Sequence, residues 1–328
     1  MKNYNLKDKI NSYLDKSYIN CEFLISGRAA IDLAIKESLL KNPNIKIYVP
    51  NYICDSMIKP FLDNDLTLNF YNVLYDDENF DIDIKPFEND DNALVLYCDY
   101  FISNLKTYEK VVNSLSPNAI LIHDITHTIF SKNYLDYRDD YIVCSLRKWF
   151  VTIDGGLCIA KTPIYSEIKE ENKEYLKLKE AAYNAKTVYY KFPTIDNREY
   201  YDKLSDMAEY ELNNNYSLYK MSAQTTKIIN NVNMDEVFKE KSMMFDTIRN
   251  LLVNYNILEG ANKENCIFTI PLIKLCDRDK VYNELKQLLI RCAVMWDFGV
   301  DEIYKDFVDK SLCIDISNNT IKRLRKEK

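Results

Sequence analysis

Residues 119–127 read AILIHDITH, and residues 141–150 read YIVCSLRKWF. Each stretch begins as a short apolar run and then turns polar. That pattern is typical of a strand buried on both faces of a parallel sheet, followed by a loop at its carboxyl end. In open α/β proteins, ligands bind beyond the carboxyl ends of such strands. The polar residues after these two runs are therefore the first candidates for a functional site.

The segments around these runs alternate between strand-like and helix-like patterns. Strands are predicted at 45–49, 66–71, 93–98, 119–122, 141–144 and 157–160, and helices at 29–40, 53–62 and 108–115. Repeated β-α-β units place parallel strands in one sheet with helices on both faces. The sequence thus predicts an α/β fold with a mostly parallel sheet.

The composition of the sequence changes beyond residue 165. Residues 165–255 are charged, rich in tyrosine and poor in Gly and Pro, which predicts extended helices. The last part holds a strand at 267–273, a helix at 279–290 and a strand at 312–316, which predicts a small α+β domain. We therefore expect a large domain over 1–235, with an N-terminal segment over 1–20 and a helical extension over 165–235, and a smaller C-terminal domain over 236–328.

Composition narrows the class of protein. The 328 residues are 47% apolar and carry a net charge of −7, which fits a folded core and argues against nucleic acid as a partner. No apolar run has signal-peptide character or approaches the roughly 20 residues of a membrane span, so we expect a soluble, cytoplasmic protein without membrane contact. The nine cysteines form no C-x-x-C pair and are interpreted as buried, reduced thiols.

Asp124 stands between the only two histidines of the chain, His123 and His127, just after the run 119–122. A buried carboxylate needs a partner. At this place it could hold a ligand's protonated ring nitrogen by a charge-assisted hydrogen bond worth ~1.5–3 kcal/mol, and His127 could reach another polar atom of that ligand. Asp124 as a helix cap and the trio as a metal site are the alternatives; the absence of a third histidine makes the metal site the weaker one.

Ser145 and Lys148 lie three residues apart on the turn that leaves the run 141–144. They can project to the same side, so that the hydroxyl binds a phosphate while the amine forms an imine with an aldehyde. A nucleophilic lysine needs a lowered pKa, which burial and nearby cations provide. The alternative is a surface lysine beside the aromatic pair Trp149-Phe150.

Ser26, Gly27 and Arg28 directly precede the helix predicted at 29–40. The free N–H groups and the positive dipole end of a helix start suit a phosphate. Ser26 as a simple helix cap is the alternative.

A pair of glycines and a tyrosine next to predicted strands are further candidates for the site. Gly155 and Gly156 follow Asp154 and precede the strand at 157–160, either as a hairpin turn or as a place where backbone approaches a ligand closely. Tyr52 follows the strand at 45–49 and could stack on a flat ring.

Taken in order, SGRAAI (26–31), VPNYIC (49–54), HDITH (123–127), CSLRKWF (144–150) and IDGGLCIA (153–160) resemble the DegT/DnrJ/EryC1/StrS family of PLP-dependent sugar aminotransferases. Order and spacing agree over residues 26–162. The resemblance implies the aspartate-aminotransferase-like fold type I of PLP-dependent transferases, pyridoxal 5'-phosphate (PLP) as cofactor, and a homodimer.

The resemblance also implies a role for each matching residue. Lys148 would be the Schiff-base lysine and the proton carrier, Asp124 would pair with the pyridinium nitrogen, and His127 would bond the phenolic oxygen. The phosphate would lie against Ser26, Gly27, Arg28 and Ser145, and Tyr52 would stack on the ring. Two residues separate Ser145 from Lys148 where relatives usually have four, and Arg28 stands where Thr or Ser is usual.

The implied reaction is transamination of a nucleotide-linked keto-sugar, with glutamate as amino donor. Other interpretations of the same residues stay open. The chain could be a PLP enzyme for a small non-sugar ketone, a PLP lyase, or a catalytically silent homologue that binds PLP or a sugar nucleotide.

Overall fold

A computed structural model describes residues 20–75, 80–101, 104–129, 138–258, 261, 269–294, 296 and 302–325. The predicted N-terminal segment before residue 20, and Cys266 among the cysteines, lie outside these residues.

A seven-stranded sheet forms the centre of the molecule, with strand order β1-β9-β8-β7-β6-β2-β3. Its strands are β1 (Asn20–Leu24), β2 (Lys46–Pro50), β3 (Leu68–Tyr71), β6 (Ala93–Cys98), β7 (Ile120–Asp124), β8 (Tyr141–Cys144) and β9 (Gly156–Ala160). The strands from β8 through β3 are parallel, whereas β9 is antiparallel to both β8 and β1. The predicted mostly parallel sheet is confirmed.

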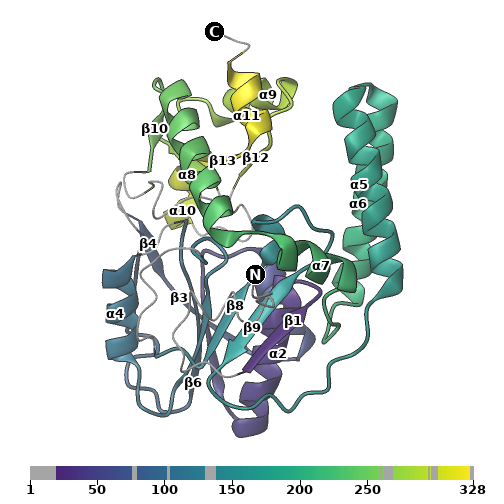
Figure 1. Cartoon of the computed structure of the whole chain (residues 1–328). Coiled ribbons are helices and arrows are strands. Elements are labelled where there is room, and N and C mark those ends of the chain that lie inside the picture. Colours follow the sequence, from purple (N-terminus) through teal and green to yellow (C-terminus); the bar gives the residue numbers. More distant parts are fainter. Residues whose placement is uncertain are drawn as a thin grey trace.

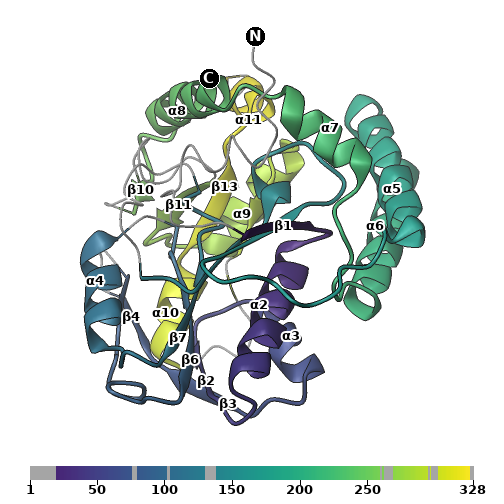
Figure 2. The same cartoon turned by 60° about the horizontal axis from the view of Figure 1, so that its bottom comes forward.

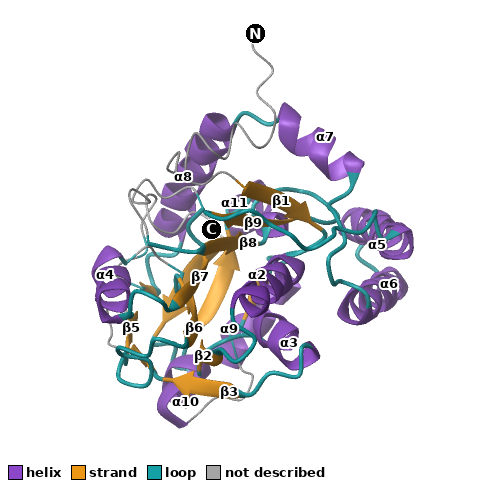
Figure 3. Cartoon of the chain, turned by 90° about the horizontal axis from the view of Figure 1, so that it is seen from below, coloured by secondary structure: helices purple, strands orange, loops and turns teal. Residues whose placement is uncertain are grey.

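Helices cover both faces of this sheet. The helix α2 (Gly27–Lys41) packs on β1, β7, β8 and β9 and on α3 (Asp55–Asp63), while α4 (Leu105–Ser114) lies on the opposite side (Figure 3). Every residue of β6, β7, β8 and β9 is buried, as expected of strands covered on both faces.

The helical region forms two parts. Helices α5 (Lys173–Lys191) and α6 (Ile195–Asn214) form an antiparallel pair that stands away from the sheet (Figure 1), and α7 (Ala223–Asn231) and α8 (Met234–Leu251) follow it. The extended helices predicted over 165–255 are confirmed. No helix among the described residues is long and apolar enough to cross a membrane.

A second, antiparallel sheet has the order β10-β11-β13-β12. It consists of β10 (Asn256–Ile257), β11 (Thr269–Ile273), β12 (Cys292–Ala293) and β13 (Leu312–Asp315), with helices α9 (Arg278–Gln287), α10 (Glu302–Asp309) and α11 (Asn318–Leu324). Helix α8 lies beside α11 (Figure 2), and its side chains Phe245 and Ile248 share an apolar cluster with Ile270 and Ile314 of the sheet.

Two strand pairings were not predicted from the sequence. No strand was predicted at residues 20–24, which form the edge strand β1, and β4 (Val73–Tyr75) with β5 (Phe80–Ile82) forms a small separate hairpin. The eight described cysteines are free, as predicted, but Cys276 is exposed, so the prediction of buried thiols is wrong there.

The start of β9 lies in direct backbone contact with the start of α2. A Cβ on Gly156 would lie 2.0 Å from the carbonyl oxygen of Ser26, and the N–H of Gly155 donates to Ile25 at 2.9 Å. Gly155 has a φ of +132°, which favours glycine. The buried carboxylate of Asp154 accepts hydrogen bonds from the N–H and hydroxyl of Ser222, the cap of α7. This segment is therefore a junction of β1, α2, β9 and α7.

We expect Gly156→Ala to lower the free energy of unfolding by about 2–4 kcal/mol, because the added methyl group forces β9 away from Ser26. Urea titration measures the change. Gly27→Ala is the matched control, since its Cβ would meet Ser145 at 3.0 Å and the helix gains from alanine. A loss for Gly156→Ala no larger than that for Gly27→Ala would contradict the assignment.

Candidate active site

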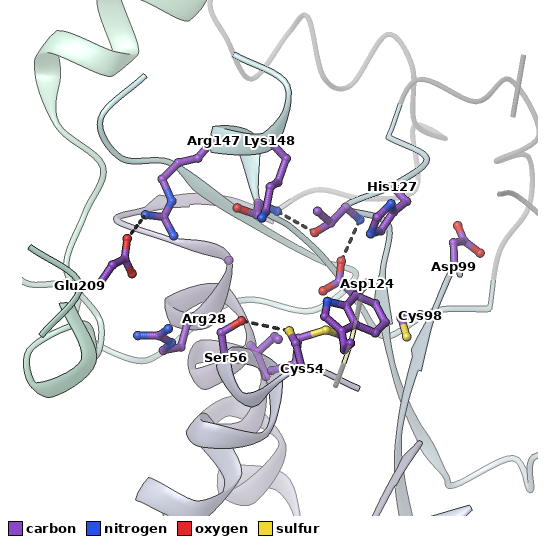
Figure 4. Close-up of a pocket in the computed structure, with 16 residues that line it drawn as sticks. Arg28, Cys54, Ser56, Cys98, Asp99, Asp124, His127, Arg147, Lys148 and Glu209 are labelled. Carbon is purple, nitrogen blue, oxygen red and sulfur yellow. Dashed lines mark hydrogen bonds and ion pairs between the residues drawn. The ribbon is translucent and has the colours of Figure 1, made fainter. Parts of the chain in front are cut away.

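A cavity of about 340 Å³ opens beyond the carboxyl ends of β6, β7 and β8, a size typical of small-molecule sites. Side chains from distant parts of the chain face it (Figure 4). Its lining includes Gly27, Arg28, Cys54, Cys98, Asp99, Asp124, Thr126, His127, Ser145, Arg147, Lys148, Glu209 and Trp296. The sheet edge predicted to carry the site is the edge at which this pocket lies.

Asp124 is the last residue of β7 and is buried. Its Oδ1 accepts a hydrogen bond from the N–H of Thr126 at 2.7 Å, so it caps a turn and not a helix. Burial raises the pKa of Asp124, and the Thr126 bonds and His123 oppose that rise. The hydroxyl of Thr126 also accepts from the N–H of Ser145 at 2.9 Å, which ties the loops after β7 and β8 together.

His127 lies on the same turn and is buried beside the pocket, edge-on to the ring of Phe101 at 5.1 Å. Burial and the nearby charge of Lys148 lower the pKa of His127 to about 3, against the opposing effect of Asp99. The ring is therefore neutral at physiological pH. Among the described residues, no group of three or more His, Cys, Asp or Glu side chains is placed to hold a metal ion.

Lys148 ends the single 3-10 turn Leu146–Lys148 that leaves β8. The Lys148 side chain is exposed and lines the pocket, between the buried side chains of Leu146 and Trp149. Loss of solvent around the ammonium group, with Arg291 and Arg147 nearby, lowers the pKa of Lys148 to about 8; Cys54 and Glu209 act in the opposite direction.

The amino end of α2 opens onto the pocket through Gly27 and Arg28. Gly27 allows the helix start to approach Ser145, since a Cβ there would lie 3.0 Å from the Ser145 Cβ. Ser26 is fully buried, does not line the pocket, and accepts from the N–H of Ala29 at 3.2 Å. The helix-cap alternative describes its side chain correctly, because the hydroxyl is used within the helix.

Tyr52 does not line the pocket, so its predicted stacking on a ligand is corrected. Its ring is 1% exposed and lies in an aromatic cluster, stacked on Phe80 and Tyr100 at centroid distances of 5.9 and 5.6 Å. Its hydroxyl accepts from the N–H of Trp296 at 3.1 Å. The aromatic side chain that does line the pocket is Trp296, which no local sequence pattern connected with the site.

Arg147 and Glu209 link the pocket to the α5–α6 pair (Figure 4). Arg147 lies 3.6 Å from the Glu209 carboxylate and donates to the hydroxyl of Tyr175 at 3.0 Å, and Lys179 lies 2.8 Å from Glu209. Burial raises the pKa of Glu209, but Arg147 and Lys179 outweigh it and lower the value. Glu209 was not predicted from the sequence, because no local pattern distinguishes one acidic residue in a helix that is rich in charged residues.

No protein-family model matches the chain, and no curated protein matches it. A protein of Streptococcus pneumoniae described as a sugar aminotransferase, Spr1654, was solved in a PLP form and has a TM-score of 0.61, with 97% of this chain and 88% of that chain covered at 12% identity. The sugar aminotransferase CalS13 of Micromonospora echinospora has a TM-score of 0.59, with 97% and 88% covered at 12% identity. The chain has the fold of these proteins.

The fold predicted from the sequence, fold type I of the PLP-dependent transferases, is thereby confirmed. The same fold includes a GDP-4-keto-6-deoxymannose-3-dehydratase, ColD, in a form with bound GDP-perosamine, at a TM-score of 0.56 and 13% identity, with 97% of this chain and 90% of that chain covered. The sugar enzymes among these structures agree with the resemblance seen in the motifs.

Glu209→Gln should lower the pKa of Lys148 below its value of about 8, because the carboxylate that favours the ammonium form is lost. The measurement is the pH midpoint of Lys148 acetylation, followed by mass spectrometry. Glu199→Gln is the control, since this exposed residue of α6 does not line the pocket and should leave the midpoint unchanged. An unchanged or raised midpoint in Glu209→Gln would rule out the influence of Glu209.

Proposed function

We propose that this chain is a PLP-dependent aminotransferase of the DegT/DnrJ/EryC1/StrS type, which transfers the amino group of glutamate to a nucleotide-linked keto-sugar. One observation carries the proposal. Asp124 and Lys148 come from the ends of the neighbouring strands β7 and β8 and line one pocket together with the amino end of α2.

The residues of the pocket fit the chemical groups of PLP. The Lys148 amine, with a pKa of about 8, suits the aldehyde, and the buried carboxylate of Asp124 suits a protonated ring nitrogen. Gly27 and Ser145 form a close approach at a helix start, which suits a phosphate. The neutral ring of His127 suits the phenolic oxygen.

When bound, PLP would supply an electron sink that stabilises negative charge on the substrate carbon. Side chains of the protein would stabilise the charge on the ring, transfer the proton and exclude water. Asp124 would hold the ring nitrogen in its charged form, and Lys148 would accept and return a proton, since a pKa of about 8 lets both of its forms exist near neutral pH. Trp296 would shield one side of the pocket from water.

The charges of the pocket support an anionic substrate. Arg28 and Arg147 line it, and Arg291 is the cation with the largest effect on the pKa of Lys148, in a chain whose net charge is −7. Guanidinium groups pair with carboxylates and phosphates, so Arg28 and Arg147 can bind an anion although the lining also holds carboxylates. Both glutamate and a nucleotide diphosphate carry the complementary charge.

We also propose that two copies of the chain associate, that the protein is cytoplasmic, and that residues 1–235 and 236–328 are its two domains. Support for the homodimer comes from the α5–α6 pair, which exposes large apolar side chains that a partner could cover. They are Tyr183, Val188, Phe192, Ile195, Tyr200, Met207 and Tyr210.

The first test is covalent trapping of the cofactor. We expect added PLP to give a visible absorbance band, and borohydride reduction to fix one phosphopyridoxyl group on Lys148 by mass spectrometry. Lys148→Arg keeps the positive charge without a nucleophilic amine and should abolish both signals. Labelling of surface lysines alone, or a band that survives in Lys148→Arg, would overturn the assignment.

Glutamate separates the possible reactions. An aminotransferase should lose its visible band on addition of glutamate and regain it with an acceptor keto-sugar nucleotide. A band that glutamate leaves unchanged, together with turnover of a sugar nucleotide without any amino donor, would favour a lyase. A band without turnover of either kind would indicate a silent binding protein.

A further inference from the structure

His123 lies behind the pocket, on the strand β7, and is only 1% exposed. Because successive residues of a strand point to opposite faces, its side chain points away from that of Asp124. Its Nε2 lies 3.3 Å from the Asp99 carboxylate, and its Nδ1 lies 3.1 Å from the Asp139 carboxylate. Both acids are buried as well.

Two tyrosine rings flank this imidazole. Tyr108 stacks on it at a centroid distance of 5.2 Å and an angle of 22°, and Tyr97 packs against it at 4.9 Å. The Tyr108 hydroxyl donates to the second oxygen of Asp139 at 3.1 Å. The imidazole is therefore enclosed by rings on its faces and by carboxylates at both nitrogens.

The protonation state of His123 follows from this enclosure. A neutral imidazole has a single N–H, whereas a carboxylate lies within hydrogen-bond distance of Nδ1 and another lies within ion-pair distance of Nε2. Burial lowers the pKa of His123, but Asp139 and Asp99 outweigh it and raise the pKa to about 10. The imidazole thus carries a positive charge throughout the physiological pH range.

Asp99 connects this buried charge with the pocket. It follows β6, its N–H donates to the backbone carbonyl of Asp124 at 3.2 Å, and it lines the pocket beside that residue. One oxygen of Asp99 faces His123, and the other accepts from the hydroxyl of Thr128. Since both oxygens face protein donors, Asp99 is suited to hold its neighbours in place.

Several charged or titratable groups influence Asp124. Burial raises its pKa, His123 lowers it, and Asp99 raises it. The three nearby thiols, Cys54, Cys98 and Cys144, have pKa values raised by burial and are uncharged. Without the imidazolium, Asp124 would lie beside Asp99 with less compensating charge and would bind a proton more readily.

We propose that His123 is a fixed positive charge that keeps Asp124 ionised, and that Asp99 and Asp139 are positioning residues that hold this charge behind the pocket. The benefit for a ligand's cationic ring nitrogen rests on the proposed function. The charge on His123 does not, because it depends only on the buried residues around it.

The charge of His123 is measured directly by NMR on the wild-type protein. With only two histidines in the chain, ¹⁵N-histidine labelling gives two imidazole spin systems, and His127→Gln assigns them. We expect one ring to remain doubly protonated from roughly pH 6 to 9 and the other to remain neutral. If the His123 ring loses its proton near the ordinary pKa of about 6.5, the proposal is wrong.

The effect on Asp124 is measured with His123→Gln and Asp139→Asn. His123→Gln should weaken PLP binding, by about tenfold for each unit by which the pKa of Asp124 comes to exceed the assay pH, and should raise the pH at which the visible band changes. By NMR, Asp139→Asn should lower the pKa of His123 from outside the pocket, and it should weaken PLP binding only above the pH at which His123 then loses its proton, because loss of the Asp139 charge alone does not disfavour the Asp124 carboxylate. Tyr108→Phe removes a hydrogen bond to Asp139 without altering charge and should change PLP affinity by less than about twofold.

The outcomes separate the two proposals. If wild-type protein gives no visible band with PLP, the proposed function fails while the NMR result still decides the charge of His123. If the band forms and His123 is charged, but neither variant alters the band or the affinity, the role of His123 toward Asp124 is refuted. Should His123→Gln fail to fold, Asp139→Asn and the wild-type spectra decide.

Discussion

The contact between Gly156 and the carbonyl of Ser26 is the constraint on which the site depends. It leaves no room for a Cβ, and it fixes the start of β9 against the start of α2. The same helix start lies against Ser145, on the loop from which Lys148 projects. The strand β9 and the loop at Ser145 are thus held against the start of α2, which lies more than a hundred positions earlier in the chain.

Several charged groups that are removed from water lie beside a group of opposite charge or accept hydrogen bonds. Arg147 meets Glu209, Asp154 receives two hydrogen bonds from Ser222, and His123 is clamped between two acids. Unmatched charge in such surroundings would cost several kcal/mol or be neutralised. Lys148 differs from these groups, because it is exposed and lies near cations. Its cationic neighbours favour the neutral amine, which is the form required of a nucleophile.

Much of the fold followed from periodicity, because buried parallel strands such as 93–98 and 141–144 are continuous apolar runs whose limits agree with the structure. Of the residues expected at the site, Gly27, Arg28, Asp124, His127, Ser145 and Lys148 share one pocket. Tyr52 and Ser26 do not, because a cluster of rings and a helix cap engage their side chains. Trp296 and Glu209 reach the pocket through tertiary folding from distant segments, which local patterns do not encode.

Trp149 and Trp296 are the only tryptophans of the chain, and both belong to the pocket region. The indole of Trp149, next to Lys148, donates to the carbonyl of Thr126 at 2.6 Å, while Trp296 lines the cavity from the C-terminal part of the chain. All indole emission of this protein therefore originates beside the site. Energy transfer from these indoles to a chromophore in the cavity can therefore be measured by fluorescence without an added label.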